Sequence, residues 1–400
     1  MSAAGMRKGV FSCPSFRIAI VGGGQLGKMM TVAAKQFGFH VSVLDPTPGS
    51  PAAQVADCQK VASFHDREAI RRLAEEADVL TYEFEHIDCT ALDELESSGF
   101  PVFPAAGLLR TIQHKLAQKQ ALQAAGIPVP HFKAVSGPAD LRAAAEQFSY
   151  PLLLKACTGG YDGKGNYLLR APEEIAQALE VLGETDLMAE KFVPFACEVS
   201  VLAARGRDGE VKTYPLSENE HQDNILRRSI VPARVGESVA GRAREVAEAV
   251  MNEFAGVGVF CVEMFVTTDG GVLVNEVAPR PHNSGHYTIE ACVTSQFEQH
   301  IRAIAGLPLG DTSLCLPAVM VNLLGAEGQD GPAVLKGYRQ ALALPGLHLH
   351  LYGKAITAPQ RKMGHITVTA ANQEQALSVA EQAQNLLSVV AAGEAEDNDC

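Results

Sequence analysis

The sequence predicts a chain of several domains that combine an α/β region with α+β regions, and three observations support this prediction. Its 400 residues exceed what one hydrophobic core usually serves, so two or three domains are expected. Short apolar strands alternate with helical stretches over residues 17–112, which is typical of a parallel sheet. After residue 190, longer strand-like runs dominate and end in a β-hairpin.

The composition excludes several classes of protein. No apolar run approaches the length of a membrane span, and residues 1–16 lack the continuous apolar core of a secretory signal, so they are expected to form a loose leader. Nine cysteines without metal-ligand spacing suggest reduced thiols in a cytoplasmic protein. A net charge of −13 argues against a general nucleic-acid or membrane surface. An acidic protein that handles phosphates must therefore concentrate its cations locally.

The N-terminal region begins with a strand at 16–21 that runs into a glycine-rich turn at 22–27 and a helix to about residue 37. Together with Asp45, which ends the next strand at 40–44, the turn has the form of a dinucleotide fingerprint. The same glycines would serve any turn that brings backbone amides to a phosphate, so a phosphate-bearing substrate is an equal alternative. Further strands are expected at 60–62, 79–84 and 101–103, with a helix near 66–76.

Residues 113–189 form the next region, in which helices are expected at 113–125 and 139–148, with strands at 132–135, 152–156 and 165–169. The loop between the last two strands has four glycines in seven residues, which is excessive for a single turn. We interpret it as a flap that folds over the phosphates of a nucleotide, with Lys155 beneath it. A mobile hairpin with an exposed lysine is the alternative.

In residues 190–315, strand-like runs at 198–204, 211–216 and 225–231 surround a polar segment at 217–224. Two alternating runs then flank the turn 267–271, which has hairpin chemistry. This pairing places Glu263 and Glu276 on one face of the sheet, close in sequence to Arg280 and His282. Paired carboxylates beside cations suggest a hard divalent metal and phosphate, although a solvated hairpin face is the alternative.

The C-terminal region, 316–392, has short strand-like pieces with many glycines and prolines, and residues 393–400 form an acidic tail. Two basic clusters lie at 350–354 and 361–365 and include Lys354 and Arg361. Three cations this close together in an acidic protein would suit a phosphoester.

Six motifs carry a resemblance to a known family. They are GGGQLG at 22–27, YEFE at 82–85, GYDGKG at 160–165, NEVAPRPHNSGHYT at 275–288, YGK at 352–354 and RKMGH at 361–365. In this order they resemble the ATP-grasp superfamily, and within it the 5-(carboxyamino)imidazole ribonucleotide synthases. The run that ends in NSGHY and the RKMGH motif are the specific ones.

The resemblance implies an ATP-grasp architecture: a parallel α/β pre-ATP-grasp domain (17–112), a nucleotide clamp with small (113–189) and large (190–315) subdomains, and a small C-terminal domain (316–392). It implies that bicarbonate attacks the γ-phosphate of ATP to give carboxyphosphate, whose carboxyl unit passes to 5-aminoimidazole ribonucleotide in purine biosynthesis. It also implies a homodimer with small-molecule partners and neither nucleic acid nor membrane.

The resemblance further implies residue roles. Glu263 and Glu276 would hold Mg²⁺ or Mn²⁺. Catalytic roles fall to Asp162, Arg280, His282 and Asn283. Nucleotide binding falls to Lys115, Lys155, Gly160, Tyr161, Asp162, Gly163, Lys164, Gly165, Asn166, Glu190, Lys191, Phe192, Val193, Glu198, His221, Asn275 and Glu276. The ribonucleotide would contact Gln25, Glu83, Tyr161, Asp162, Arg280, Lys354 and Arg361.

Some positions depart from the family pattern, and three alternatives stay open. Lys115 stands where many members have Arg, which keeps the charge but loses the bidentate fork, and His86 replaces a frequent Asn. Another ATP-grasp ligase, such as a formate-using glycinamide ribonucleotide transformylase or a biotin carboxylase, would share the hairpin and flap but need a different acceptor site. A nicotinamide-dependent oxidoreductase and a non-catalytic nucleotide-binding regulator are the other two.

Overall fold

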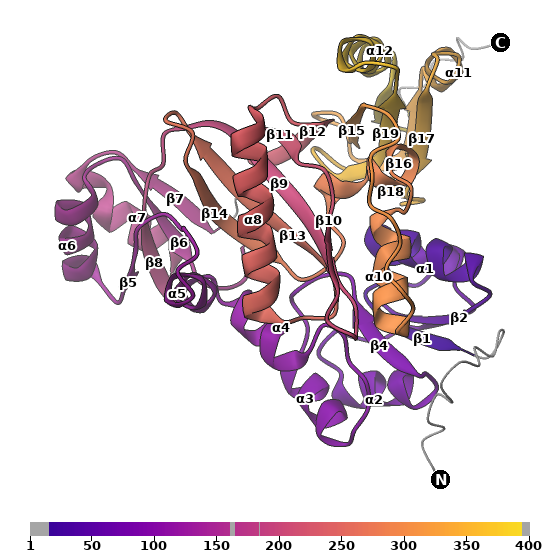
Figure 1. Ribbon diagram of the computed structural model, residues 1–400, viewed down its shortest axis with the longest axis horizontal. Helices are drawn as coiled ribbons and strands as arrows, with labels where there is room; N and C mark the ends of the chain where they lie inside the picture. The colour runs from indigo at the N-terminus through magenta and orange to yellow at the C-terminus, as the bar shows by residue number, and fades with distance from the viewer. Residues whose placement is uncertain (1–15, 161–164, 184, 394–400) are drawn as a thin grey trace. The chain divides into compact units, whose positions relative to one another are not determined.

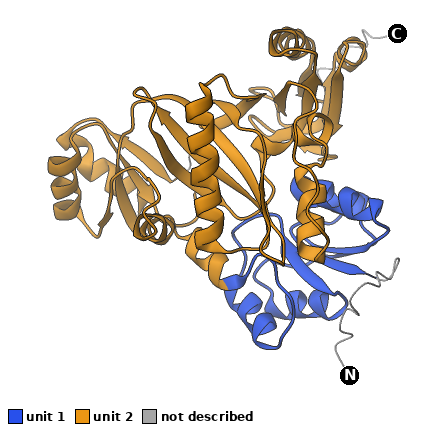
Figure 2. Cartoon of the chain, in the orientation of Figure 1, with its two compact units in different colours: residues 1–106 blue, residues 107–400 orange. Residues whose placement is uncertain are grey.

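The computed structural model describes residues 16–160, 165–183 and 185–393. The chain divides into two compact units, residues 1–106 and residues 107–400 (Figure 2). Within the described residues, no helix is both long and apolar enough to cross a membrane.

The first unit is built on a four-stranded parallel sheet in the order β3-β2-β1-β4. This confirms the prediction of a parallel sheet. Asp66 and Asp88 start two of its helices by accepting hydrogen bonds from backbone amides of the first turn. The elements are β1 (Arg17–Val21), α1 (Gln25–Gln36), β2 (His40–Leu44), η1 (Ala52–Gln54), β3 (Cys58–Lys60), α2 (Arg67–Glu75), β4 (Val79–Tyr82) and α3 (Cys89–Ser97).

The expected strand at 101–103 is wrong. The segment makes only a single bridge, between Leu80 and Val102, with hydrogen bonds to both backbone groups of Leu80. Pro101 begins the segment and Pro104 follows it, and neither can donate to a ladder, so the pairing does not extend. The helix α3 was not expected from the sequence.

The second unit contains a small antiparallel sheet in the order β5-β8-β6-β7, packed against α6 and α7. The helix expected at 113–125 is confirmed as α5, and a second helix, α4, precedes it and was not expected from the sequence. They are separated at His114, which has an extended backbone and whose ring accepts a hydrogen bond from the amide of Ala117. These elements are α4 (Ala106–Gln113), α5 (Lys115–Ala124), β5 (Phe132–Val135), α6 (Pro138–Phe148), β6 (Leu152–Ala156), β7 (Asn166–Leu169), η2 (Pro172–Glu174), α7 (Ile175–Leu182) and β8 (Leu187–Lys191).

A nine-stranded antiparallel sheet forms the body of this unit, in the order β14-β13-β9-β11-β12-β15-β19-β17, with β10 paired to β9 (Figure 1). The helix α8 packs its apolar residues against β9, β13 and β14, which encloses the main core. The members are β9 (Phe195–Arg205), β10 (Val211–Thr213), β11 (Ser217–Gln222), β12 (Ile225–Val231), α8 (Glu237–Phe254), β13 (Gly258–Thr267), β14 (Val272–Ala278), β15 (Ala318–Leu324), β17 (Leu347–Leu351) and β19 (Lys362–Thr369).

The C-terminal strands β15, β19 and β17 therefore extend the large sheet, while α12 packs on β15 and β19. The smaller elements of the unit are η3 (Asn283–Gly285), α9 (Thr288–Ala291), α10 (Gln296–Ala305), β16 (Gly331–Lys336), α11 (Tyr338–Leu342), β18 (Ile356–Thr357), α12 (Gln373–Leu386) and β20 (Ser388–Ala391).

The polar segment expected between strands at 217–224 is instead largely the strand β11. Its polar side chains are tolerated inside a sheet because they bond to one another across strands. Ser217 and Asn219 both contact Ser200, and Glu218 pairs with Arg234.

Candidate functional site

The hairpin β13–β14 brings the two predicted carboxylates together. Its turn is closed by a hydrogen bond from the amide of Thr267 to the carbonyl of Gly271 at 2.9 Å. Glu263 and Glu276 are direct partners in the register of the two strands. Because partners across an antiparallel pair project to the same side of the sheet, the predicted pair on one face is confirmed as geometry.

A β-bulge lies beside this pair. Met264, the residue after Glu263, pairs with Val274 rather than Asn275, so Asn275 is the extra residue of β14. A bulge of this kind bends the strand and redirects its side chains. The extra residue, Asn275, is one of the expected nucleotide-binding residues.

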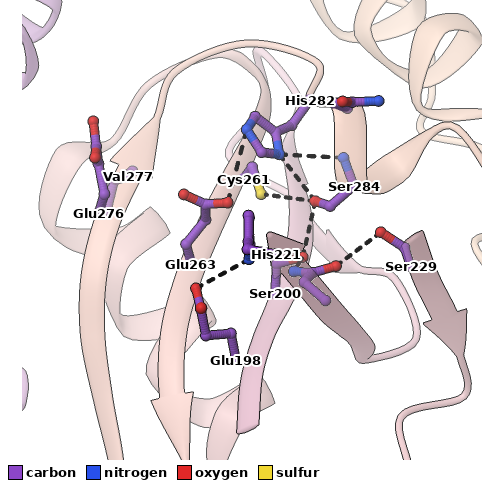
Figure 3. A network of polar contacts seen from close by, with 12 residues as sticks. Glu198, Ser200, His221, Ser229, Cys261, Glu263, Glu276, Val277, His282 and Ser284 are labelled. Carbon is purple, nitrogen blue, oxygen red and sulfur yellow. Dashed lines mark hydrogen bonds and ion pairs between the residues drawn. The ribbon is translucent and has the colours of Figure 1, made fainter. Parts of the chain in front are cut away.

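Glu198 and His221 come from the neighbouring strands β9 and β11, on the side of β13 opposite to β14 (Figure 3). His221 Nδ1 lies 3.2 Å from Glu198 Oε2. Burial alone would lower the pKa of His221, but Glu198 outweighs it and raises the pKa above its ordinary value. The contact therefore favours the charged form of His221 beside the carboxylate of Glu198.

His282 is held by a network of hydroxyl groups in the large sheet (Figure 3). Its Nδ1 lies 2.9 Å from the hydroxyl of Ser284, which accepts from Ser200 at 2.9 Å, and Ser200 in turn accepts from Asn219. Its Nε2 lies 3.8 Å from Glu263. Burial, together with Arg280 and Lys362, holds the pKa of His282 well below its usual range, so the ring is neutral. The role of these serines was not expected from the sequence, although Ser284 lies in the specific NSGHY motif.

The donor set around Glu263 favours a hard cation. Cys261, Glu263 and His282 place one donor atom each within 4.8 Å of the others. Burial raises the pKa of the Cys261 thiol, so the sulfur stays protonated and is a poor ligand at neutral pH. Burial also raises the pKa of Glu263, with Glu276 and Glu198 adding to this effect. A carboxylate whose ionisation is opposed mainly by burial is one that an incoming divalent cation would stabilise.

Lysines from the small sheet and from α5 reach toward this face. Lys115 Nζ donates to Glu276 at 2.8 Å. Burial would raise the pKa of Glu276, but Lys115, with Lys155 and Lys119, keeps it below its ordinary value. Lys155 Nζ donates to Glu190 at 2.6 Å. Lys119, which was absent from our expectations, lies 2.9 Å from the other oxygen of Glu190.

The helix α5 is fastened to the carboxylate strand β14. The side-chain amide of Gln118 bonds to both backbone groups of Val277, at 3.1 and 3.0 Å, and Lys119 donates to the carbonyl of Val274 at 3.0 Å. These contacts join the helix that carries Lys115 to the strand that carries Glu276.

Only the ends of the predicted flap are described. Tyr161, Asp162, Gly163 and Lys164 lie outside the described residues. At its base the amide of Ala156 donates to the carbonyl of Gly165 at 2.8 Å, and Lys155 is the register partner of Asn166. Gly159, Gly160 and Gly165 thus lie directly beyond the strand that carries Lys155. Across the same sheet, β8 contains Glu190, ends at Lys191, and is followed by the half-buried Phe192 and Val193.

The remaining expected residues of this unit lie near the C-terminal strands. Asn283 exchanges two side-chain hydrogen bonds with Asn322 of β15, at 2.7 and 3.0 Å. The guanidinium of Arg280 donates to the carbonyl of Pro281. Lys354 Nζ donates to the carbonyl of Lys362 at 2.7 Å, and the exposed Arg361 donates to the carbonyl of Ile356. Each of these two side chains thus contacts a backbone carbonyl of the C-terminal region.

In the first unit, carboxylates cover the glycine-rich turn. Glu83 accepts hydrogen bonds from the amides of Gly24 and Gly27, and Asp45 accepts from Gly23 at 2.9 Å. A Cβ on Gly22, which has φ of +106°, would lie 2.3 Å from Glu83 Cγ. The amides that a dinucleotide pyrophosphate would need are therefore already bonded, which removes the support for a nicotinamide cofactor. Gln25, the first residue of α1, is half-buried beside this turn.

Three family models match the chain in sequence order. They are the ribonucleotide synthetase preATP-grasp domain over residues 16–113, the ATP-grasp domain over 120–297, and the phosphoribosylaminoimidazole carboxylase C-terminal domain over 318–379. The predicted ATP-grasp fold is thus confirmed.

Individual relatives agree with these models. The N5-carboxyaminoimidazole ribonucleotide synthase of Bacillus subtilis (strain 168) is 46% identical over 357 residues, which cover 88% of this chain and 91% of the relative. The N5-carboxyaminoimidazole ribonucleotide synthetase from Thermotoga maritima has a solved structure with a TM-score of 0.87 and 49% sequence identity. The match covers 94% of this chain and 99% of the Thermotoga chain. The synthase from Aspergillus clavatus was solved with ADP and 5-aminoimidazole ribonucleotide, and it has a TM-score of 0.86 and 38% sequence identity. The match covers 93% of this chain and 98% of the Aspergillus chain.

Proposed function

Because the chain belongs to the N5-carboxyaminoimidazole ribonucleotide synthases of the ATP-grasp superfamily, we propose that the hairpin face of Glu263 and Glu276 is where it activates bicarbonate with ATP. The chain is an ATP-dependent ligase that converts 5-aminoimidazole ribonucleotide and bicarbonate to N5-carboxyaminoimidazole ribonucleotide in purine biosynthesis. The observation that carries the assignment of the site is the direct register of two carboxylates beside Lys115.

The reaction has two balanced steps. An oxygen of bicarbonate attacks the γ-phosphorus of ATP, the bond to the bridging oxygen breaks, and ADP leaves carboxyphosphate behind. The amine of the ribonucleotide then attacks the carboxyl carbon, inorganic phosphate departs and the nitrogen loses a proton. Glu263 and Glu276 would hold Mg²⁺, which when bound neutralises the charge on the phosphates.

The chain's own residues orient the reactants and exclude water. Lys115 and Lys155 bind phosphate oxygens, and the flap over 160–165 closes on them to protect a labile acyl phosphate. The backbone after Glu190 holds adenine and Glu198 holds the ribose, while His221 keeps the charge of Glu198 balanced. His282, neutral and fixed by Ser284, donates or accepts a hydrogen bond without adding charge.

The second substrate is assigned to the remaining residues. Lys354 and Arg361 bind the phosphate of the ribonucleotide, and Gln25, Glu83 and Tyr161 contact its sugar and base. Arg280 and Asn283 lie at the carboxyl group that is being made, and Asp162 orients or deprotonates the attacking amine. Support for these roles comes from the motifs that contain the residues and from the relative from Aspergillus clavatus, which was solved with 5-aminoimidazole ribonucleotide.

The test is a substrate panel followed by ADP release. We expect release to require 5-aminoimidazole ribonucleotide, bicarbonate and Mg²⁺ together, and omission of any one to reduce it to background. Faster turnover with glycinamide ribonucleotide and formate would contradict this assignment. Sedimentation of the same sample tests the homodimer that we propose.

A further inference from the structure

Three buried charges meet where α5, β6 and β8 come together. Glu190 accepts a hydrogen bond from Lys155 at 2.6 Å through one carboxylate oxygen and lies 2.9 Å from Lys119 through the other. The side chain of Glu190 is 1% exposed, that of Lys119 3% and that of Lys155 10%. The cluster therefore holds two cations and one anion, with a net charge of +1, almost entirely away from water.

The two lysines differ in how they are anchored. Lys119 also donates to the carbonyl of Val274 at 3.0 Å, and its neighbour Gln118 bonds to both backbone groups of Val277. It is thus fixed between two sheets and faces the carboxylate strand β14. Lys155 sits at the end of β6, next to the base of the glycine-rich flap, and its side chain is the most exposed of the three.

A carboxylate this deeply buried requires a partner at all times. Removing one partner from a buried ion pair leaves an uncompensated charge, which costs roughly 3–5 kcal/mol. If Lys155 were the sole partner of Glu190, turning its ammonium group toward a phosphate would leave Glu190 in that condition. A second, fixed lysine removes the cost, because Glu190 stays paired when Lys155 moves.

We propose that Lys119 is a positioning residue for the ATP site: it neutralises Glu190 permanently and so leaves the ammonium group of Lys155 available to the phosphates of the nucleotide. Lys119 itself does not touch ATP. This inference rests on the proposed site for ATP and assigns a separate residue to it. In this scheme the nucleotide meets the net charge of +1 that two ammonium groups and one carboxylate give the cluster.

The decisive experiment compares charge states of the cluster. Lys119→Met reduces its net charge to zero and leaves Lys155 locked to Glu190, so we expect the Kd for ADP and the KM for ATP to rise about tenfold, equivalent to about 1.4 kcal/mol. Lys119→Arg keeps the charge and should restore most of the affinity. The double variant Lys119→Met with Glu190→Gln returns the net charge to +1, and we expect it to bind ADP several-fold more tightly than Lys119→Met alone.

A matched control is Lys212→Met. Lys212 makes the same kinds of contact, 3.0 Å to the carbonyl of Leu309 and 3.3 Å to Glu210, on the edge strand β10. The variant Lys212→Met should leave the Kd for ADP unchanged. Thermal unfolding of each variant separates loss of structure from loss of affinity.

Calorimetric binding of ADP keeps this inference separate from the reaction, because it needs no turnover. An unchanged Kd in Lys119→Met would overturn it, as would a double variant that binds no better than the single one, which is the result expected of a purely structural lysine. Failure of the wild-type chain to release ADP with the three substrates would instead count against the proposed function. The recovery in the double variant remains informative even where Lys119→Met folds poorly.

Discussion

The two compact units surround their carboxylates with opposite partners. In the first unit, Glu83 and Asp45 accept hydrogen bonds from backbone amides of the glycine-rich turn. In the second, Glu276 and Glu190 are paired with lysine ammonium groups. Backbone amides are fixed in place, whereas lysine side chains can turn toward another anion. The difference teaches that a glycine-rich turn need not be a phosphate site, and that the exchangeable charges lie in the second unit.

The largest expected effect comes from removing a carboxylate that is paired with a lysine in the second unit. Glu276→Gln takes away a proposed metal ligand, so we expect kcat to fall on the order of 10²–10³-fold. The fold should persist, because Glu276 is 45% exposed and its pair with Lys115 adds little stability. Steady-state ADP release measures the loss, and Glu253→Gln on the exposed side of α8 is the control. Retained turnover would show that Glu276 does not hold the metal.

A carboxylate that is bonded to backbone amides, as in the first unit, should contribute to the stability of the fold. Glu83→Gln leaves a neutral acceptor where two backbone amides meet a carboxylate, so we expect the first unit to lose about 1–3 kcal/mol of its free energy of unfolding. Hydrogen exchange at the amides of β1 measures this quantity. The exposed Glu94→Gln, on α3, should change it by less than about 0.5 kcal/mol. Equal protection in Glu83→Gln and wild type would remove the contrast between the units.

The pH dependence of the free energy of unfolding should also differ between the two units, because His300 is buried in the second. Burial lowers the pKa of His300 to about 3, while its ring accepts a hydrogen bond from the amide of Val259. Below about pH 6.5 the unfolded chain binds a proton that the folded chain refuses, so stability from this group is present above pH 6.5 and is lost as the pH falls toward 3. The loss is about 1.4 kcal/mol between pH 7.5 and pH 5.5.

The variants His300→Gln and His65→Gln test this dependence. The first removes the titrating group and should flatten the fall in unfolding free energy of the second unit, measured by hydrogen exchange at the amides of β13. The second removes an exposed histidine of the first unit and should leave that fall unchanged. An unaltered slope in His300→Gln would mean that its ring does not stay neutral in the folded chain.

The smallest effect is expected from Lys115→Arg. The family resemblance implies arginine at this position in many members, and arginine would keep the charge beside Glu276 while adding a bidentate fork. We expect kcat and the KM for ATP to stay within about threefold of wild type, in the same ADP-release assay. Lys115→Met, as the partner variant, should weaken ATP binding clearly. Similar values for both variants would show that charge at residue 115 is unimportant.

Local patterns made the carboxylate pair predictable. Alternation with period two and hairpin chemistry at 267–271 are properties of neighbouring residues, and together they fix that Glu263 and Glu276 share a face. The parallel sheet of the first unit followed from the same kind of reasoning. The chemistry, in contrast, followed from the resemblance and not from spacing.

Features that depend on distant partners were not predictable. In the sequence, Lys119 cannot be distinguished from a solvent-exposed lysine of a helix, because its partners Glu190 and Val274 lie far away in the chain. The bulge at Asn275 is likewise defined only by the pairing of β14 with β13. The strand β11 was missed because its buried polar residues are satisfied by other strands. The start of α5 was placed two residues too early because His114 is an uncommon residue for starting a helix.

The attachment of α5 to β14 has a consequence for how the enzyme is made. Lys115 and Glu276 are 161 positions apart in the chain, and Lys119 and Val274 are 155 apart. At typical rates of translation, a ribosome needs on the order of ten to thirty seconds to synthesise the intervening segment. During that time α5 has no strand to attach to, and Lys115 and Glu276 cannot meet. The growing chain therefore gains the proposed nucleotide site late, after β14 emerges.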